Sequence, residues 1–237
     1  MTPPVFVVPA AAIDDARPGV DVRLDGPEGR HAVTVRRLTA GEPVRLVDGA
    51  GRYADATVSV VIDASTADLV VVAAGREPEP APRIVVVQAL PKGERGELAV
   101  EVLTEVGTDV IVPWAAERCV AVWRGEKAVR GRRRWVDTAH AAAKQARRAR
   151  FPVVEELATT VDVVARVASA SLALVLHEDA TDPIGDVGLP AEGDVLLVVG
   201  PEGGISASER EELSAAGARE VRLGPSVLRT STAGVAA

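Results

Sequence analysis

Residues 195–213, VLLVVGPEGGISASEREEL, contain the turn best suited to hold a ligand. A strand-like apolar run ends there at Gly-Pro-Glu-Gly-Gly, and a helical pattern begins a few residues later. Glycines allow close backbone approach, and ligands bind at the carboxyl ends of strands in open α/β sheets. Glu202 is the ionisable side chain of this turn. It could cap its own helix in a tight connection, or it could face a cationic or hydrogen-bond-donating ligand.

Two familiar phosphate-binding motifs do not explain this turn. A P-loop requires GxxxxGK[ST], which does not occur in the chain. The dinucleotide fingerprint GxGxxG follows the first strand of its unit, whereas GPEGG has another spacing and lies late in the sequence. The carboxylate of Glu202 would also repel a phosphate.

A second Gly-Pro turn lies in residues 221–234, VRLGPSVLRTSTAG, where Arg229 follows an apolar pair. The sequence LHE at 176–178 ends a third strand-like run. Glycine turns at the ends of neighbouring strands form a pocket lined by main-chain N–H and C=O groups. Such a pocket suits a ligand that is read through the backbone, as the edge of an adenine is.

Two regions of different periodicity must position these turns. Up to residue 74, short alternating or β-branched runs between Gly and Asp favour a small β-barrel. Residues 75–83, GREPEPAPR, are a Pro- and Glu-rich linker and the expected domain boundary. From 84 to 237, apolar strand runs alternate with helical patterns, including a long basic helix over about 128–149. This alternation predicts an α/β domain with a parallel sheet covered on both faces.

The helix after the glycine turn has clear ends. Ser206 precedes Glu209 by three positions, the spacing of a capping box, and Gly217 is suited to end the helix.

The composition bounds the class of protein. The 237 residues carry a net charge of −7 and one cysteine, Cys119, which excludes an internal disulfide and fits a reducing compartment. His31, His140, His177 and this cysteine show no metal-ligand spacing, so no metal is expected. The opening residues lack signal-peptide features, and no apolar run reaches the length of a membrane span. We expect a cytoplasmic protein without a membrane partner.

One basic block stands out against the acidic chain. Residues 124–150 contain ten Lys or Arg and two Asp or Glu. Such a block favours a directed contact with nucleic-acid phosphates, although a solvated helix face would have the same composition.

Several motifs, taken together and in order, resemble one family. They are HAVTVRRLTAGEPVRLVDGAG at 31–51, PKGERGELAVEVLTEVGTDVIVPWAAERC at 91–119, KQARRARFP at 144–152, GPEGG at 200–204 and LGPSVLRTSTA at 223–233. This set is similar to the bacterial 16S ribosomal RNA uridine N3-methyltransferases, a branch of the SPOUT, or trefoil-knot, methyltransferases. The resemblance runs nearly end to end.

The resemblance implies a PUA-like RNA-binding β-barrel at 1–74 and a SPOUT domain at 84–237 with a C-terminal trefoil knot. It also implies S-adenosylmethionine as cofactor, 16S rRNA in the small ribosomal subunit as partner, and a homodimer. Arg229 and Glu202 become the candidate catalytic residues, Glu202 either accepting the uracil proton or bracing its loop. The implied cofactor-binding residues are Leu176, His177, Gly200, Glu202, Gly203, Gly204, Leu223, Gly224, Leu228 and Thr230.

The candidate RNA-binding residues are His31, Arg37, Lys92, Arg118, Gln145 and Arg148, with a structural role equally open for His31. The chain departs from the family pattern at Ser231 and Lys144, where glutamates are usual. It also stops at AGVAA, where the resemblance leads us to expect a longer final helix. Two other functions stay open at this point: ribose 2′-O-methylation on the same fold, and a non-catalytic RNA-binding assembly factor.

Overall fold

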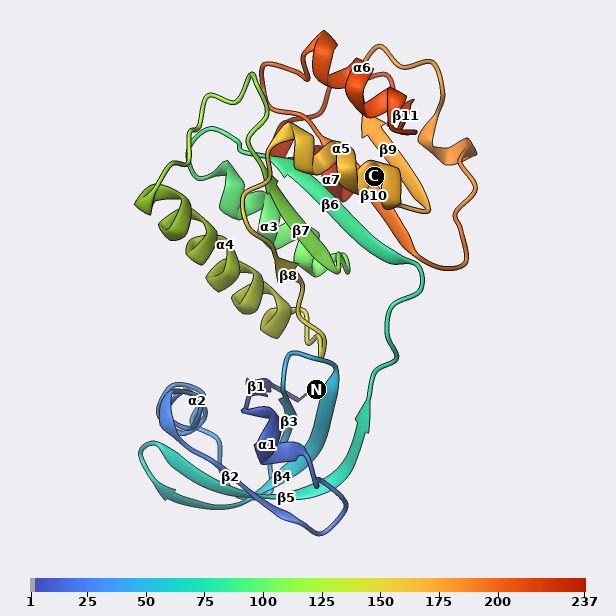
Figure 1. Cartoon of the computed structure of the whole chain (residues 1–237). Helices are drawn as coiled ribbons and strands as arrows, with labels where there is room; N and C mark the ends of the chain where they lie inside the picture. The colour runs from blue at the N-terminus through green and yellow to red at the C-terminus, as the bar shows by residue number, and fades with distance from the viewer. Residues whose placement is uncertain (1–2) are drawn as a thin grey trace. The chain divides into compact units, whose positions relative to one another are not determined.

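The computed structural model describes residues 3–237, which divide into two compact units (Figure 1). The first unit extends to Glu79 and includes Ala143–Phe151, and the second comprises Pro80–Ala142 and Pro152–Ala237. Backbone hydrogen bonds attach the returning segment to the first unit: the Phe151 N–H donates to Gly49 O at 2.8 Å, and the Gly51 N–H donates to Ala149 O at 3.0 Å. The sequence suggests the contiguous ranges 1–74 and 84–237, in which residues 143–151 would belong to the second unit and not to the first.

The first unit is a five-stranded sheet in the order β1-β3-β4-β5-β2. Its strands are β1 (Val5–Val7), β2 (Asp21–Leu24), β3 (Pro43–Val47), β4 (Arg52–Asp63) and β5 (Thr66–Arg76). Register shifts between β4 and β5 allow the sheet to bend. One hydrophobic core joins Phe6 on edge strand β1 with Leu24 on the other edge strand and Leu46 and Leu69 between them. The pattern of short strands is confirmed, whereas the short helices α1 (Ala10–Ile13) and α2 (Gly26–Arg30) and the π-helical turn His31–Val35 were not anticipated.

The second unit has a six-stranded sheet in the order β11-β9-β10-β6-β7-β8, and every neighbouring pair is parallel. Its strands are β6 (Arg83–Ala89), β7 (Val110–Trp114), β8 (Val153–Val154), β9 (Leu172–Leu176), β10 (Asp194–Val199) and β11 (Arg219–Val221). The helices are α3 (Arg95–Glu105), α4 (Glu126–Gln145), α5 (Thr160–Ser169), α6 (Ala207–Ala215) and α7 (Thr230–Ala236), with a 3-10 turn at Ile184–Asp186. The predicted α/β class with a parallel sheet is confirmed.

Both faces of this sheet are buried, which is why its strands are apolar throughout. Along β6, Val85 and Val87 belong to the core under α5 and α6, and Val86 belongs to the core under α3 and α4. Successive strand residues point to opposite faces, so a strand covered on both sides needs an apolar residue at every position.

The end of the long basic helix differs from the expectation. The sequence pattern suggested a helix to about residue 149, but α4 ends at Gln145. Arg147 has φ of +58°, a left-handed conformation that stops a helix and turns the chain. After this turn, residues 149–151 contact the loop between β3 and β4 of the first unit.

The chain returns to the middle of the sheet after its last strand. β11 lies at one edge of the sheet, yet α7, the helix that follows, packs against α3 and against the central strands β6 and β10. A return of this kind is what the expected knot requires.

Candidate functional site

Three strand ends and one helix start meet around a cavity of about 270 Å³ in the second unit. The contributing segments are the residues after β9, the GPEGG turn after β10, the loop between β11 and α7, and the first turn of α3. A smaller hollow of about 70 Å³ shares Leu176, His177 and Leu228 with it and extends to Leu223 and Gly224. The two Gly-Pro turns and the strand end singled out in the sequence therefore form one continuous site.

Most of the expected cofactor and catalytic residues line this site. Those on the larger cavity are Leu176, His177, Gly200, Glu202, Gly204, Leu228, Arg229 and Thr230, and those on the smaller hollow include Leu223 and Gly224. Gly203 is the exception, because it faces Arg118 instead. A Cβ at Gly203 would lie 3.1 Å from Arg118 Cβ, and Arg118 Nη1 donates to Gly203 O at 3.3 Å.

The helix behind the glycine turn is anchored by a buried carboxylate. Ser206 and Glu209 form the predicted capping box, and Gly217 follows the helix with φ of +107°. Glu209 also accepts from the Glu117 N–H and the Thr160 hydroxyl, each at 2.9 Å. These bonds connect α6 to the loop after β7 and to the start of α5, so the helix that follows the GPEGG turn is held in place.

Glu202 is held by the loop between β6 and α3. Its Oε1 accepts the backbone N–H of Lys92 at 3.1 Å and lies 3.8 Å from Nη1 of Arg95. Arg95 also lines the cavity, and sequence reasoning did not single it out. Its position in the first turn after the first strand of the α/β unit was the available signal. Lys92, expected to contact RNA, thus has a backbone role here as well.

Arg229 carries an exposed guanidinium at the rim of the cavity. It is the N-cap residue of α7, and its carbonyl accepts the N–H groups of Thr232 and Ala233 at 2.9 Å. Its side chain has no ion-pair partner among residues 3–237. A cation with a fixed backbone and a free head can donate to a ligand oxygen.

His177 is oriented by its neighbours. Its N–H donates to Val221 O at 3.1 Å, and its Nδ1 accepts the N–H of Asp179 at 3.1 Å. These bonds hold the strand end between β9 and β11.

Two polar atoms near the start of α7 lack partners among the described residues. The Ser231 hydroxyl and Gln88 Oε1 are buried without a hydrogen bond, whereas the Gln88 amide nitrogen donates to Ala89 O at 3.1 Å and Thr230 O at 3.3 Å. Ser231 is 2% exposed. The glutamate expected from the family pattern would bury a charge at this position.

The other expected RNA-binding residues belong to the first unit. His31 and Arg37 are exposed, and the His31 ring meets the edge of Phe6 at a centroid distance of 6.0 Å. Gln145 is exposed and Arg148 is half-buried. Beside them, Lys144 donates to both carboxylate oxygens of Glu28, at 2.6 and 2.9 Å.

Within residues 3–237, no group of three His, Cys, Asp or Glu is placed to hold a metal ion, and no helix is both long and apolar enough to cross a bilayer. Burial raises the pKa of the Cys119 thiol, which keeps the thiol protonated at neutral pH and unsuited to be a nucleophile.

The site fits a nucleoside-type ligand. Its walls are mainly apolar side chains and backbone, and its charged lining residues are Arg95, Glu178, Glu202, Arg222 and Arg229. Gly224 has nothing within 4 Å of the position a Cβ would take, so the backbone there is open to a ligand. Gly200 is required for a different reason, since a Cβ would lie 2.7 Å from Ile205 Cγ1. A preformed hollow with few polar groups and exposed backbone is typical of a cofactor site.

Comparison with known proteins agrees with this architecture. An RNA methyltransferase domain model matches residues 77–237, and an RNA methyltransferase PUA domain model matches residues 24–72. Ribosomal RNA small subunit methyltransferase E of Mycobacterium bovis is 48% identical over 220 residues, which cover 90% of this chain and 83% of that protein. The Bacillus subtilis protein of the same name is 28% identical over 89% of this chain and 85% of its own length.

Two solved structures are similar over almost the whole chain. A methyltransferase from Legionella pneumophila, in complex with bound SAM, has a TM-score of 0.84 and 28% identity, covering 100% of this chain and 95% of its own. Ribosomal RNA small subunit methyltransferase E from Neisseria gonorrhoeae, bound to S-adenosyl methionine, has a TM-score of 0.83 and 25% identity, covering 99% and 94%. The SPOUT-type fold with an N-terminal PUA domain is therefore confirmed, and the chain belongs to the family of ribosomal RNA small subunit methyltransferases E.

Proposed function

We propose that this protein transfers the methyl group of S-adenosylmethionine to N3 of a uridine in the 16S rRNA of the small ribosomal subunit. Family membership and the names of the relatives support rRNA methylation, and the two neighbours solved with SAM support the cofactor. The observation that carries the proposal is the cavity formed by the two glycine-containing turns and the end of β9, with Arg95, Glu202 and Arg229 on its rim.

The cofactor would be held mainly by backbone. Leu176, Gly200, Leu223, Gly224 and Leu228 lie on the connected hollows and would contact the adenosine part. When bound, S-adenosylmethionine supplies an electrophilic methyl group. Holding two reactants in line can lower a barrier by several kcal/mol.

Arg229 would stabilise the uracil in its reactive form. The N3–H lies between two carbonyls, and the nitrogen becomes a good nucleophile only as its proton leaves and negative charge spreads to the oxygens. A guanidinium aimed at one of these oxygens stabilises that charge. The guanidinium of Arg229, exposed at the cavity rim and without an ion-pair partner among residues 3–237, supports this role.

Glu202 would position its loop and leave the proton to another acceptor. Its Oε1 already accepts the Lys92 N–H and lies near Arg95. A carboxylate with these partners fixes the GPEGG turn against the start of α3, which keeps the cavity open in one shape.

RNA would be held by residues of both units. We assign His31, Arg37, Gln145 and Arg148 of the first unit, and Lys92 and Arg118 of the second, to contacts with phosphates or with the target base. A target uridine inside stacked RNA must leave its stack to reach the cavity. The PUA domain and the basic composition of α4 suit a large, structured ribonucleoprotein substrate.

We also propose that the protein acts as a homodimer. The resemblance carries this proposal, and the exposed apolar side chains of Leu98 and Val106 at α3, 44% and 61% exposed, are compatible with a protein partner there. Light scattering of the purified chain gives the mass directly.

The first experiment is calorimetric titration of the purified chain with S-adenosylmethionine, followed by methylation of unmodified small ribosomal subunits. We expect binding, and a methylated uridine whose Watson–Crick face is blocked, so that reverse transcriptase stops beside it. A product resistant to alkaline cleavage at the modified nucleotide would instead show ribose methylation. RNA binding without cofactor binding by an intact dimer would favour an assembly factor.

A further inference from the structure

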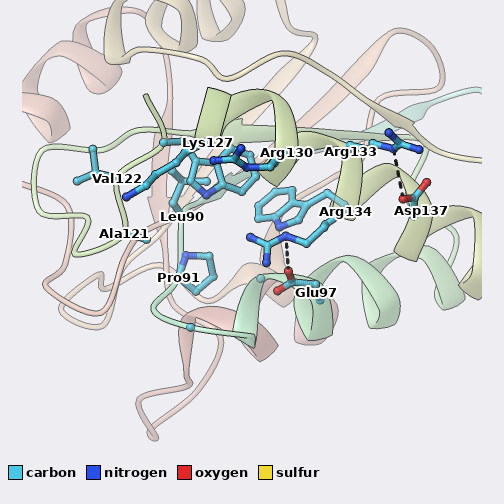
Figure 2. A pocket seen from close by; sticks show the side chains of 14 residues that line it. Leu90, Pro91, Glu97, Ala121, Val122, Lys127, Arg130, Arg133, Arg134 and Asp137 are labelled. Atoms are coloured by element: carbon cyan, nitrogen blue, oxygen red, sulfur yellow. Dashed lines mark ion pairs between the residues drawn. The ribbon is translucent and has the colours of Figure 1, made fainter. Parts of the chain in front are cut away.

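A second and larger cavity, of about 710 Å³, lies between α4 and the start of α3 (Figure 2). We call it the α4 groove and define it by the basic side chains of Lys127, Arg130, Arg133 and Arg134. Two acidic side chains, Glu97 and Asp137, also line it. The cofactor site described above does not use any of these six residues.

The basic side chains follow one face of the helix. Lys127, Arg130 and Arg134 are three and four positions apart, the spacing that stacks side chains along one stripe. At 1.5 Å per residue they cover about 10 Å of helix axis. Figure 2 shows the side chains of Lys127, Arg130 and Arg134 along the helix above Pro91 and Glu97. A row of this length fits a chain of phosphates better than one small anion.

The groove has a rigid wall. Trp123 and Trp135 meet edge to face with ring centroids 5.2 Å apart. Each ring lies against a glycine: a Cβ at Gly131 would be 2.4 Å from Trp123, and a Cβ at Gly96 would be 2.9 Å from Trp135. Close packing of rings on helix backbone holds α4 against α3, so the cations are displayed on a preformed surface.

The existing ion pairs of the groove are weak. Arg134 lies 3.5 Å from Glu97, and Arg133 lies 4.0 Å from Asp137, with arginine side chains 68% and 83% exposed. Exposed pairs of this kind contribute about 0–1 kcal/mol. Lys127 has no ion-pair partner in the described part of the chain. Arg130 is paired with Glu126 at 3.1 Å, also through exposed side chains, so this pair is of the same weak kind. The cations are therefore available to a stronger anionic ligand.

The groove and the cofactor site share one loop. Pro91 and Gly93 line the groove, whereas the Lys92 N–H holds Glu202 and Arg95 lines the cofactor cavity. An RNA strand whose target base enters the cavity therefore needs to cross only residues 91–95 to bring its flanking phosphates to α4.

We infer that the α4 groove binds backbone phosphates of the substrate RNA that flank the modified nucleotide, an inference that rests on the proposed function. Lys127, Arg130 and Arg134 make the phosphate contacts, and Trp123 forms the apolar wall beside them. These residues contribute RNA affinity and take no part in methyl transfer.

The test is the salt dependence of binding to an unmodified 16S rRNA transcript. Each phosphate contact that is lost lowers the slope of log K against log salt by about 0.7–0.9. We expect the slope of Lys127→Gln to be less steep by the amount of about one phosphate contact. The slope of Lys127→Gln/Arg130→Gln should be less steep by the amount of about two contacts. Lys127→Arg, which keeps the charge, should retain the wild-type slope.

Arg83→Gln is the matched control. It removes the same charge from an arginine paired with Asp194 at the amino end of β6, away from both sites. Methylation kinetics supply a second measurement: the groove variants should raise KM for RNA and leave kcat and S-adenosylmethionine affinity unchanged, the pattern of lost uniform binding.

The inference is overturned if the groove variants, folded by their thermal unfolding, keep the wild-type salt slope and KM. It is also overturned if Arg83→Gln lowers the slope equally, because the effect would then be one of net charge. The salt slopes do not depend on methyl transfer. Absence of cofactor binding by the wild-type chain would contradict the proposed function. The salt slopes of RNA binding would still test the α4 groove.

Discussion

Nη1 of Arg95 lies 3.8 Å from Oε1 of Glu202, the same oxygen that accepts the backbone N–H of Lys92. The start of α3 is thereby joined to the GPEGG turn, although 110 positions separate Lys92 from Glu202. This contact favours the loop-holding role among the two considered for the acidic residue of the turn, because a carboxylate with both partners is suited to hold a loop.

Glu202→Gln tests that role. The amide oxygen can still accept the Lys92 N–H, and only the exposed pair with Arg95 is lost. We expect the methylation rate to fall by less than about tenfold, since such a pair contributes about 1 kcal/mol or less. The pH dependence of kcat should be unchanged. A loss of about 10²–10⁴ together with a missing limb of the pH profile would identify Glu202 as the proton acceptor.

Arg229→Gln should lower kcat by about 10²–10³, the usual effect of removing one donor that stabilises developing negative charge. The affinity for S-adenosylmethionine, measured by calorimetry, should change little, because the guanidinium is assigned to the uracil. Arg219→Gln on β11 is the control, since Arg219 is an exposed arginine paired with Asp182 and lies outside the cavity lining. Equal losses in both variants would contradict the assignment.

Lys144 stands where the family pattern has a glutamate. Its Nζ donates to both carboxylate oxygens of Glu28, at 2.6 and 2.9 Å. Lys144→Glu should lower the free energy of unfolding by about 1–2 kcal/mol, because it removes a half-buried pair and faces two carboxylates toward each other.

The double variant Lys144→Glu/Glu28→Lys should recover part of this loss in thermal unfolding. Recovery stays partial because Glu28 Oε2 also accepts the Val7 N–H at 3.3 Å, which a lysine cannot do. A double variant no more stable than Lys144→Glu would show that the pair is not coupled.

Ser231 has a buried hydroxyl without a hydrogen-bond partner among residues 3–237. Ser231→Ala should therefore leave the stability unchanged or raise it by up to about 1 kcal/mol, since a buried unsatisfied polar group is costly. Ser231→Glu should be destabilising by about 3 kcal/mol or more, because it would bury a charge at a position that is 2% exposed. Chemical denaturation compares the two. Stabilisation by the glutamate would mean that its carboxylate finds a hydrogen-bond or ion-pair partner in this chain.

Acid should weaken the second unit through two carboxylates. Arg83 lowers the pKa of Asp194 through hydrogen bonds, and Arg210 does the same for Glu220. A depressed folded-state pKa stabilises the fold above the unfolded pKa, about 4 for these residues, and that stabilisation is lost as pH falls through the folded value. The unfolding free energy should therefore fall below about pH 4. Asp194→Asn should flatten this fall, and an unchanged pH curve would contradict it.

The secondary structure of the second unit follows from the sequence because its signals are local. The apolar strands, the Ser206–Glu209 capping box and the stop at Gly217 each depend on residues a few positions apart, and all are present in the structure. The motifs also led to the correct family. The end of α4 was misplaced, because the left-handed Arg147 leaves no mark in the helical periodicity.

The contacts that build the site depend on chain segments that are remote in sequence. Arg118 reaches Gly203 across 85 positions, and Lys92 reaches Glu202 across 110. No periodicity links such residues, because their proximity is set by strand order and by loops that converge at one edge of the sheet. The sequence by itself thus determined the elements, the family and most of the cavity residues. Only the tertiary structure decided that Arg95 and Lys92 hold Glu202, that Gly203 faces Arg118, and that α4 presents its charges along a groove.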